Sequence, residues 1–168
     1  MILFRRKSDL HIKLNNLKKN NFKIGLVPTM GALHQGHTSL VEKSIKENDY
    51  TVVSIFINPT QFNDKKDLKL YPKNLRKDCM HLESISSDII IFAPEIKDIY
   101  DNNLSVKKFD FNGLDKFMEG KYRKGHFNGV ATIVTHLFNI VNPNNAYFGE
   151  KDFQQLRIIQ QLVIDNNI

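Results

Sequence analysis

Residues 24–47 read IGLVPTMGALHQGHTSLVEKSIKE, and this stretch decides the fold. The apolar run Ile24–Val27 ends at Pro28, which predicts a short strand. A loop with glycines follows, and the segment from about Gly36 to Glu47 is expected to form a helix. A strand that leads through such a loop into a helix is typical of a parallel α/β sheet.

The same alternation continues along the chain. Thr51–Ile57 is β-branched and apolar and ends at Asn58-Pro59, so we expect a buried strand there. Asp88–Phe92 and Ala146–Phe148 are expected to be further strands, with a weaker one in the polar stretch Asn102–Asn112. Apolar residues at helical spacing predict helices around Leu75–Ile85, Val130–Val141 and Phe153–Val163.

Strands that alternate with helices predict one α/β domain over residues 1–168, with a mainly parallel sheet covered on both faces. In such sheets, ligands bind outside the carboxyl ends of the strands. Functional side chains are therefore expected in the loops that follow Val27, Ile57 and Phe148.

Composition and charge indicate which kinds of partner and which cellular location to expect. Lys and Arg total 24 against 18 Asp and Glu, a net charge of +6, which suits small anionic substrates. A nucleic-acid binder is an alternative that rests on this charge alone, because no ladder of aromatic and basic residues is present. No apolar run approaches the roughly 20 residues of a membrane span. Met1–Asp9 lacks the apolar region of a signal peptide, and the single Cys79 suits a reducing cytoplasm.

The loop after the first expected strand points to anion binding. It opens a helix whose N-terminal amides and dipole attract anions, and Gly31 and Gly36 allow close backbone approach. The imidazoles of His34 and His37 could donate hydrogen bonds to phosphoryl oxygens in a transition state. The alternative is a helix-capping loop with two exposed histidines. No cysteine or third histidine has the spacing of a zinc site, so we expect no resident metal.

The loops after the later strands hold amides and charges. Asn58 and Gln61 could bind a polar substrate, or they could belong to an Asn-Pro turn with Gln61 solvated. Lys151 could neutralise phosphate charge. Asp152 and Gln155 fit a variant of the capping box at the start of the last helix, or they could serve a ligand.

A glycine-rich segment, Glu119–Gly129, precedes the long apolar helix. Its glycines predict a shaped loop rather than a packed element. Arg123 and His126 in this loop could hold a phosphate or a carboxylate, or the loop could be an exposed connector.

Together these segments resemble the pantothenate synthetase (pantoate–β-alanine ligase) family. Its Pro-Thr-Met-Gly-x-Leu-His-x-Gly-His loop is matched at Pro28–His37 and its Asn-Pro-x-Gln-Phe turn at Asn58–Phe62. A Glu-Gly-x-x-Arg-Pro-Gly-His-Phe-x-Gly-Val segment is matched at Glu119–Val130 except that Lys124 replaces proline. Phe-Gly-x-Lys-Asp-x-Gln-Gln-Leu is matched at Phe148–Leu156. The four motifs occur in order over nearly the whole chain.

The resemblance implies a Rossmann-like fold of the His-x-Gly-His nucleotidyltransferase group and a cytoplasmic homodimer. It implies that ATP, accompanied by Mg²⁺, activates pantoate as pantoyl adenylate, and that β-alanine then displaces AMP. It places His37, His34 and Lys151 at the reacting phosphate, with His37 as proton donor. The implied ATP-binding residues are Met30, Gly31, Ala32, Leu33, His34, Gln35, Gly36, His37, Gly149, Glu150, Lys151 and Asp152. Those implied for pantoate and β-alanine are Gln61, Gln155, Asn58 and Arg123.

One departure from the family concerns its second domain. Family members carry a smaller domain after this one, with a Met-Ser-x-Arg-Asn segment that closes over the triphosphate, and this chain stops at Ile168. We therefore expect the phosphates to be less well clamped in this chain alone. Two alternatives follow: a catalytically weak binding domain of the same enzyme, or another His-x-Gly-His nucleotidyltransferase. The latter would not predict the motifs at Asn58–Phe62 and Gly149–Gln155.

Overall fold

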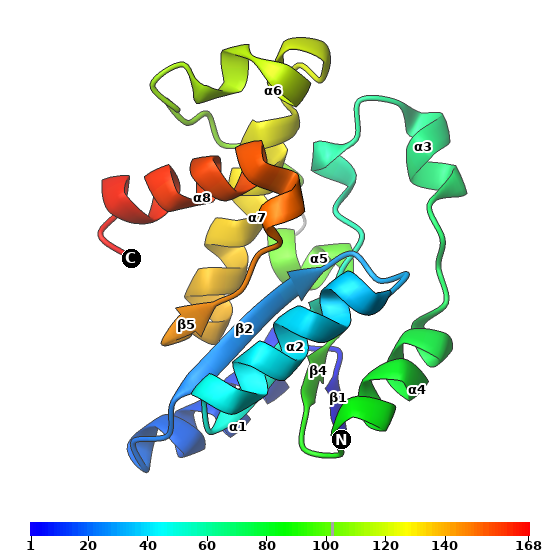
Figure 1. Ribbon diagram of the computed structural model, residues 1–168, viewed down its shortest axis with the longest axis vertical. Coiled ribbons are helices and arrows are strands. Elements are labelled where there is room, and N and C mark those ends of the chain that lie inside the picture. The colour runs from blue at the N-terminus through cyan, green and yellow to red at the C-terminus, as the bar shows by residue number, and fades with distance from the viewer. Residues whose placement is uncertain (102) are drawn as a thin grey trace.

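The computed structural model describes residues 1–101 and 103–168, which form a five-stranded parallel sheet with helices on both faces (Figure 1). The strands are β1 (Ile2–Phe4), β2 (Ile24–Thr29), β3 (Tyr50–Ile55), β4 (Ile90–Phe92) and β5 (Asn145–Ala146). All neighbouring strands pair in parallel, in the order β1-β4-β3-β2-β5. The predicted α/β class is therefore confirmed.

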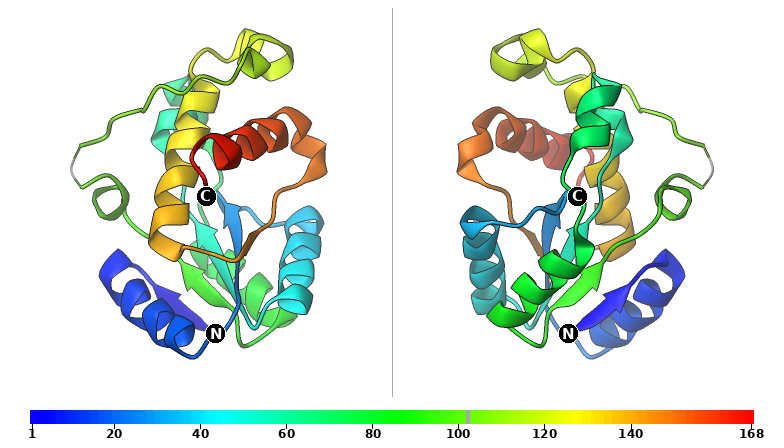
Figure 2. Two further views of the ribbon diagram at one scale, coloured as in Figure 1. Left: turned by 90° about the vertical axis from the view of Figure 1, so that its left-hand side faces the viewer. Right: turned by 90° about the vertical axis from the view of Figure 1, so that its right-hand side faces the viewer.

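Five longer helices cover the sheet: α1 (Lys7–Lys19), α2 (Gln35–Glu47), α4 (Leu75–Ile85), α7 (His126–Val141) and α8 (Phe153–Asp165). Successive strand side chains alternate between the two faces. Val52 belongs to the core cluster under α1, α7 and α8, whereas Val53 belongs to the cluster under α2 and α4. Figure 2 shows these two layers on opposite sides of the strands. Within the described residues, no helix has both the length and the apolar character that crossing a membrane requires.

The strand order places two functional loops next to each other. From β2 the chain moves outward through β3 to β4, and then returns to add β5 on the other side of β2. The order therefore reverses between β2 and β5, and ligands of open α/β sheets bind outside the carboxyl ends of the strands at such a point. The loops that follow these two strands are residues 30–34 and 147–152.

The short elements complete the chain: α3 (Lys65–Leu70), α5 (Ile96–Tyr100), α6 (Met118–Tyr122), and the 3-10 turns η1 (Pro59–Gln61), η2 (Leu114–Lys116) and η3 (Glu150–Asp152). The edge strand β1 and helix α1 were not predicted from the sequence. Strand β3 ends at Ile55 rather than Ile57, and β5 ends at Ala146 rather than Phe148, so both following loops begin earlier than expected.

The weak strand expected within Asn102–Asn112 is wrong over residues 103–111, which form no strand; Asn102 lies outside the described residues. Two backbone N–H groups of this stretch bond to side chains of α7 instead. Lys107 donates to Thr132 Oγ1 at 3.0 Å and Phe109 donates to Asn128 Oδ1 at 2.8 Å. Because α7 supplies these acceptors, the stretch needs no strand partner.

The expectation that residues 119–129 form a loop is also wrong. Helix α6 occupies its first part, and α7 begins at His126, four residues before the expected start. Gly129 lies inside α7, where it serves packing: a Cβ there would lie 2.4 Å from the carbonyl oxygen of Thr60 in η1. The first turn of α7 therefore packs directly on the turn that carries Gln61.

Candidate active site

The loop after β2 has a fixed, left-handed shape. Gly31 and Ala32 have φ angles of +81° and +51°. Thr29 Oγ1 accepts a hydrogen bond from the backbone N–H of Gly31 at 3.1 Å and donates to the carbonyl of Ser54 at 2.8 Å. The end of β2 thus ties the start of the loop to the neighbouring strand β3.

Asp78 on α4 holds the other side of this loop, and the sequence analysis missed it. Its carboxylate is 4% exposed and accepts hydrogen bonds from the backbone N–H groups of Ala32 at 3.1 Å and Leu33 at 2.9 Å. Hydrogen bonds to an ionised acceptor are among the stronger ones. The available signal was an acidic residue on the apolar face of α4, between Leu75 and Leu82.

His34 and His37 cap the N-terminus of α2 reciprocally. His34 Nδ1 accepts from the backbone N–H of Gly36 at 3.1 Å, and His37 Nδ1 accepts from the backbone N–H of His34 at 3.3 Å. An imidazole nitrogen that accepts carries no proton, so the neutral form of each ring has its proton on Nε2. The ring centroids are 4.2 Å apart. Capping therefore does not preclude the donor role, because it uses Nδ1 and leaves Nε2–H.

The electrostatics of His37 link the loops after β2 and β5. Burial lowers the pKa of His37, and the neighbouring ring of His34 lowers it further. The carboxylates of Asp78 and Asp152 raise the pKa of His37 in opposition. The strand order places the loop after β5 next to the loop after β2, and Asp152 of the former is among the charges that act on His37.

The loop after β5 is open. Glu150, Lys151 and Asp152 are exposed, and Lys151 makes no ion pair with any described residue. Asp152 occupies the N-cap position of α8 without a side-chain hydrogen bond. The capping-box interpretation of Asp152 and Gln155 is therefore wrong.

The two adjacent glutamines of α8 differ in their environment. Gln154 is 6% exposed; its Nε2 donates to the carbonyls of Leu114 and Phe117, each at 2.7 Å, and its Oε1 accepts from Gly120 N–H at 3.3 Å. Gln155 is half-buried, and its amide bonds to none of the described residues. Of these two residues, only Gln155 thus has a side-chain amide that is free for a ligand.

Asn58 and Gln61 form a buried pair at the carboxyl end of β3. Asn58 is 1% exposed and Gln61 is 9% exposed, so the alternative of a solvated Gln61 is wrong. Asn58 Nδ2 donates to Gln61 Oε1 at 3.2 Å, and Gln61 Nε2 contacts the sulfur of Met30 at 3.1 Å. This pair therefore lies against the first residue of the loop after β2.

The segment at the start of α7 completes the surroundings of Gln61. His126 is buried, and its Nδ1 lies 2.7 Å from the carbonyl of Gln61, to which it donates. Burial lowers the pKa of His126. Arg123 instead pairs with Glu119 at 2.7 Å on the surface.

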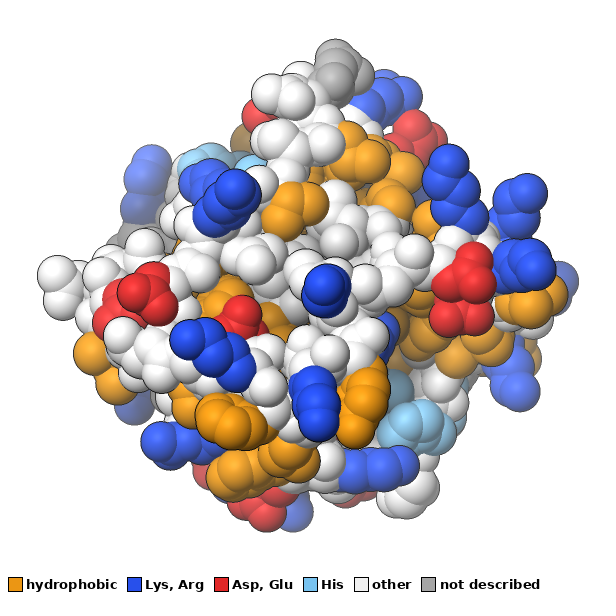
Figure 3. Space-filling view, turned by 90° about the horizontal axis from the view of Figure 1, so that it is seen from above, with side chains coloured by type: hydrophobic (Ala, Val, Ile, Leu, Met, Phe, Trp, Pro, Cys, Tyr) orange, Lys and Arg blue, Asp and Glu red, His pale blue; other side chains and the backbone are white. Residues whose placement is uncertain are grey.

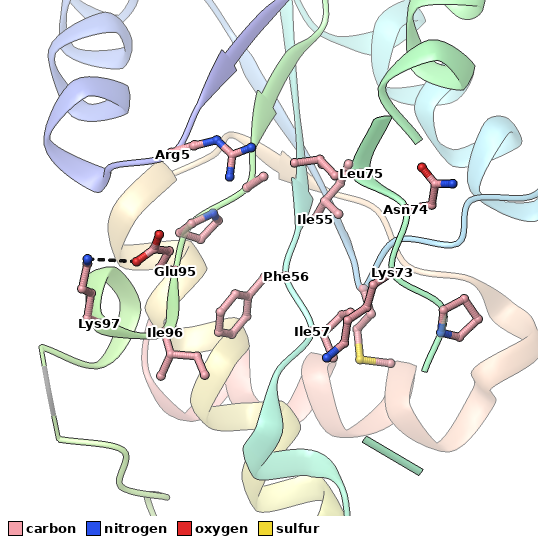
Figure 4. A pocket seen from close by; sticks show the side chains of 14 residues that line it. Arg5, Ile55, Phe56, Ile57, Lys73, Asn74, Leu75, Glu95, Ile96 and Lys97 are labelled. Carbon is pink, nitrogen blue, oxygen red and sulfur yellow. Dashed lines mark ion pairs between the residues drawn. The ribbon is translucent and has the colours of Figure 1, made fainter. Parts of the chain in front are cut away.

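A cavity of about 660 Å³ opens beside these loops (Figure 4). It shares only Met30 with the predicted site residues, so neither His34 nor His37 lines it. Figure 4 shows Arg5 and Lys73 around a space whose floor includes Phe56 and Ile57. Within residues 1–101 and 103–168, no three His, Cys, Asp or Glu side chains are grouped as a metal site would need.

Figure 3 views the molecule from the top of Figure 1, the side toward which the strands run. Lys and Arg side chains are scattered over this face among apolar and neutral ones, without a continuous stripe. A backbone-tracking groove for nucleic acid would need such a stripe.

Comparison with known sequences gives consistent matches. The profile of the family described as pantoate-beta-alanine ligase matches residues 2–168. The pantothenate synthetase of Flavobacterium psychrophilum is 54% identical over 168 residues, covering all of this chain and 60% of that protein. That of Aquifex aeolicus is 49% identical over 167 residues, or 99% of this chain and 58% of that protein. The chain thus spans about 60% of the length of the curated relatives that it matches.

Solved structures agree with this fold. The pantoate-beta-alanine ligase of Francisella tularensis, crystallised with beta-gamma ATP and beta-alanine, matches with a TM-score of 0.94 at 47% identity, over all of this chain and 64% of that one. The pantothenate synthetase of Thermus thermophilus matches with a TM-score of 0.89 at 38% identity, over 99% of this chain and 58% of that one. These neighbours place the fold in the nucleotidyltransferase superfamily. A family profile that matches from residue 2 to residue 168, with relatives about half identical along the whole chain, shows that the chain belongs to the pantoate–β-alanine ligase family.

Proposed function

We propose that this protein builds the ATP and pantoate subsites of an enzyme that condenses pantoate with β-alanine. In the first step, a carboxylate oxygen of pantoate attacks the α-phosphorus of ATP and pyrophosphate leaves, giving pantoyl adenylate. In the second, the amine of β-alanine attacks the carbonyl carbon, loses a proton, and AMP leaves as the amide forms. The observation that best supports this proposal is the loop of residues 30–37. Its two imidazoles cap the start of α2 through Nδ1 and leave their Nε2–H groups available.

The first step adds negative charge to the phosphoryl oxygens, so preformed donors accelerate it. We assign this role to the Nε2–H groups of His34 and His37 and to the ammonium of Lys151, with His37 as proton donor. The remaining residues proposed to line the ATP subsite are Met30, Gly31, Ala32, Leu33, Gln35, Gly36, Gly149, Glu150 and Asp152. Mg²⁺ would enter with the nucleotide and keep phosphate oxygens among its ligands.

For the hydroxy acid we propose Gln61 and Gln155, with β-alanine near Gln61. Gln155 has a free amide, and Gln61 loses only a weak contact with sulfur when it turns to a ligand. Asn58 has both amide atoms engaged inside the protein, so we propose that it positions Gln61 rather than touching substrate. Arg123 would have to leave Glu119 to reach a carboxylate.

The oligomeric state, the cellular location and the small-molecule partners are also part of the proposal. We infer a homodimer that works in the cytoplasm, with ATP, pantoate and β-alanine as its small-molecule partners. Because the chain spans about 60% of its relatives, activity of these 168 residues alone is a separate question from the activity of the family.

ATP–pyrophosphate exchange on this chain, with and without pantoate, tests the proposal. Pantoate-dependent exchange would show that the adenylation site is complete within these residues. Saturable binding of ATP or pantoate without exchange would support the alternative of a catalytically weak binding domain. If calorimetry shows binding of neither ligand, the proposed function is wrong for this chain.

A further inference from the structure

A buried chain of hydrogen bonds runs from Tyr100, at the end of α5, to the amide of Gln61. We propose that Tyr100 is a positioning residue that acts through Asn58 to orient the Gln61 amide, so that its NH₂ group rather than its oxygen faces the substrate. The proposal rests on the proposed function, in which Gln61 binds the hydroxy acid. It adds a residue that lies outside the loops that the sequence motifs identify.

Backbone groups determine which way the Asn58 amide points. Thr60 N–H can only donate, and it lies 3.4 Å from Asn58 Oδ1. The carbonyl of Gly129 can only accept, and Asn58 Nδ2 donates to it at 3.1 Å. An amide flipped by 180° would set a donor against a donor and an acceptor against an acceptor. The backbone therefore favours one orientation of Asn58, but the contact with Thr60 N–H, at 3.4 Å, is long and holds this orientation only weakly.

The orientation of Asn58 determines that of Gln61. Because Asn58 Nδ2 points at Gln61, the atom that meets it must be the oxygen Oε1, at 3.2 Å. The NH₂ group of Gln61 then points the other way and reaches the sulfur of Met30 at 3.1 Å. A thioether is a weak acceptor, so a carboxylate or hydroxyl oxygen of a ligand would displace it readily. Gln61 is thus prepared to donate to an oxygen acceptor on the substrate.

Tyr100 supplies the strongest side-chain bond to Asn58. Its hydroxyl donates to Asn58 Oδ1 at 2.7 Å and lies 3.2 Å from Thr60 Oγ1, which itself donates to Asn58 Oδ1 at 2.9 Å. The ring is 4% exposed and packs edge-on against His136, with centroids 5.1 Å apart. Burial raises the pKa of Tyr100, so the hydroxyl keeps the proton that it donates.

Removing the Tyr100 hydroxyl should make the orientation of the Asn58 and Gln61 amides less fixed without creating a cavity in the core. In Tyr100→Phe the aromatic ring remains, but Asn58 Oδ1 loses its shortest partner. The pair would then exchange among more orientations, and a fraction of molecules would present Gln61 Oε1 to an oxygen of the substrate. We expect the Kd for pantoate, measured by calorimetry on the 168-residue chain, to rise by about fivefold, as expected for one hydrogen bond.

Tyr147→Phe is the matched control. Its hydroxyl is likewise bonded to two side chains, Asn48 at 2.7 Å and Glu47 at 2.8 Å, but these are residues at the end of α2 opposite the His34–His37 cap. Its Kd for pantoate should equal that of the unchanged protein. A Tyr147→Phe change as large as that of Tyr100→Phe would mean that any buried hydroxyl matters, and would overturn the proposal.

A double-mutant cycle separates orientation from general loosening. In a Gln61→Ala background, the group that Tyr100 orients is gone, so adding Tyr100→Phe should leave the Kd for pantoate unchanged. If Tyr100→Phe raises the Kd for pantoate as much in this background as in the unchanged protein, Tyr100 does not act through Gln61. If Tyr100→Phe does not fold, Thr60→Val removes the second hydroxyl on Asn58 and must show the same dependence on Gln61. Absence of pantoate binding by the unchanged protein would sink the proposed pantoate subsite, whereas normal binding by Tyr100→Phe would sink only this inference.

Discussion

The carboxylate of Asp78 accepts a hydrogen bond from the backbone N–H of Leu33 at 2.9 Å, which joins helix α4 to the loop that carries the histidine pair. Asp78 also binds the backbone N–H of Ala32 at 3.1 Å. These residues lie more than 40 positions apart in the sequence. The shape of the proposed phosphate-binding loop therefore depends on a helix that contributes no other residue to the predicted site.

Replacing Asp78 with Ala should lower the free energy of unfolding by about 2–3 kcal/mol, because two part-buried N–H groups lose a charged acceptor. Urea unfolding of the 168-residue chain measures this loss. Glu83→Ala, an exposed residue on the same helix, should change stability by less than about 0.5 kcal/mol. Equal stability of Asp78→Ala and the unchanged protein would show that the loop holds its shape without this carboxylate.

Gly31→Ala should destabilise the protein by about 1–3 kcal/mol, because a left-handed residue gains a Cβ. That Cβ would also lie 2.8 Å from Asp78 Oδ2. Gly149→Ala is the comparison, since its φ is −73° and an added Cβ would meet nothing within 4 Å. Thermal unfolding of both variants checks the difference, and a loss of equal size in the two would contradict the argument from backbone shape.

Sequence reasoning located the loops of the candidate site, but it did not identify all of the residues that hold these loops in place. Apolar runs and periodicity located β2 and α7, although β2 continues through Pro28 to Thr29 and α7 begins at His126 rather than Val130. The strand β1 was missed because it has only three residues and lies at the edge of the sheet. The stretch 103–111 was misassigned because the N–H groups of Lys107 and Phe109 bond to side chains of α7, which no local pattern reveals.

Within the candidate site, local motifs identified the groups that could meet a ligand, and tertiary contacts decided which of them are free. Gln154 and Gln155 cannot be told apart from the sequence alone. In the structure, only the side-chain amide of Gln154 is hydrogen-bonded to backbone groups in and next to η2 and α6. Asn58 was predicted to bind substrate because it stands beside Gln61 in a motif. Its commitment to Tyr100 and Gly129 depends on segments 42 and 71 residues away.

The two glutamines should therefore separate stability from binding. Gln154→Ala should lower the free energy of unfolding by about 1–3 kcal/mol, because buried carbonyls lose their donor. Gln155→Ala should leave stability nearly unchanged and raise the Kd for pantoate instead. Calorimetry and urea unfolding of both variants measure the two effects, and a Gln155→Ala protein that binds pantoate normally would remove this residue from the proposed subsite.

The stability of the chain should decrease as pH falls below about 6.5. Burial is the main cause that lowers the pKa values of His37, His126 and His136 from the model-peptide value of 6.5. In this range the unfolded chain binds more protons than the folded one, so the neutral histidines contribute stability above pH 6.5 that is lost as pH falls through their folded pKa values.

Urea unfolding between pH 5 and pH 8 measures this dependence. His136→Gln should weaken it, because this change removes one of the three imidazoles with a lowered pKa at a position away from the predicted site loops. The charged and aromatic groups that face His136 are Lys7, Asp101, Lys107 and Tyr100. A stability that is flat from pH 5 to pH 7 would contradict the assignment of neutral histidines.

His37→Ala tests the division of labour between phosphate and pantoate. If the Nε2–H of His37 acts chiefly on charge that appears in the transition state, its loss should slow pantoate-dependent exchange by about 100-fold. The Kd for pantoate should change little, since a ligand in its ground state carries none of that extra charge. The exchange measurement requires a protein that turns over, so a relative with the full-length sequence can carry the same substitution if this chain binds without exchange.

His11→Ala, an exposed histidine on α1, is the control for the loss of an imidazole as such, and it should change neither quantity. The capping bond adds a second effect to His37→Ala, because the backbone N–H of His34 loses its acceptor. His37→Asn separates the two, since a short amide oxygen can cap this N–H without placing a donor where Nε2 was. Exchange should then stay low while stability recovers. If exchange and pantoate binding instead fall together by the same factor, His37 belongs to the ground-state binding site, and the role at the phosphate must be reassigned to His34 and Lys151.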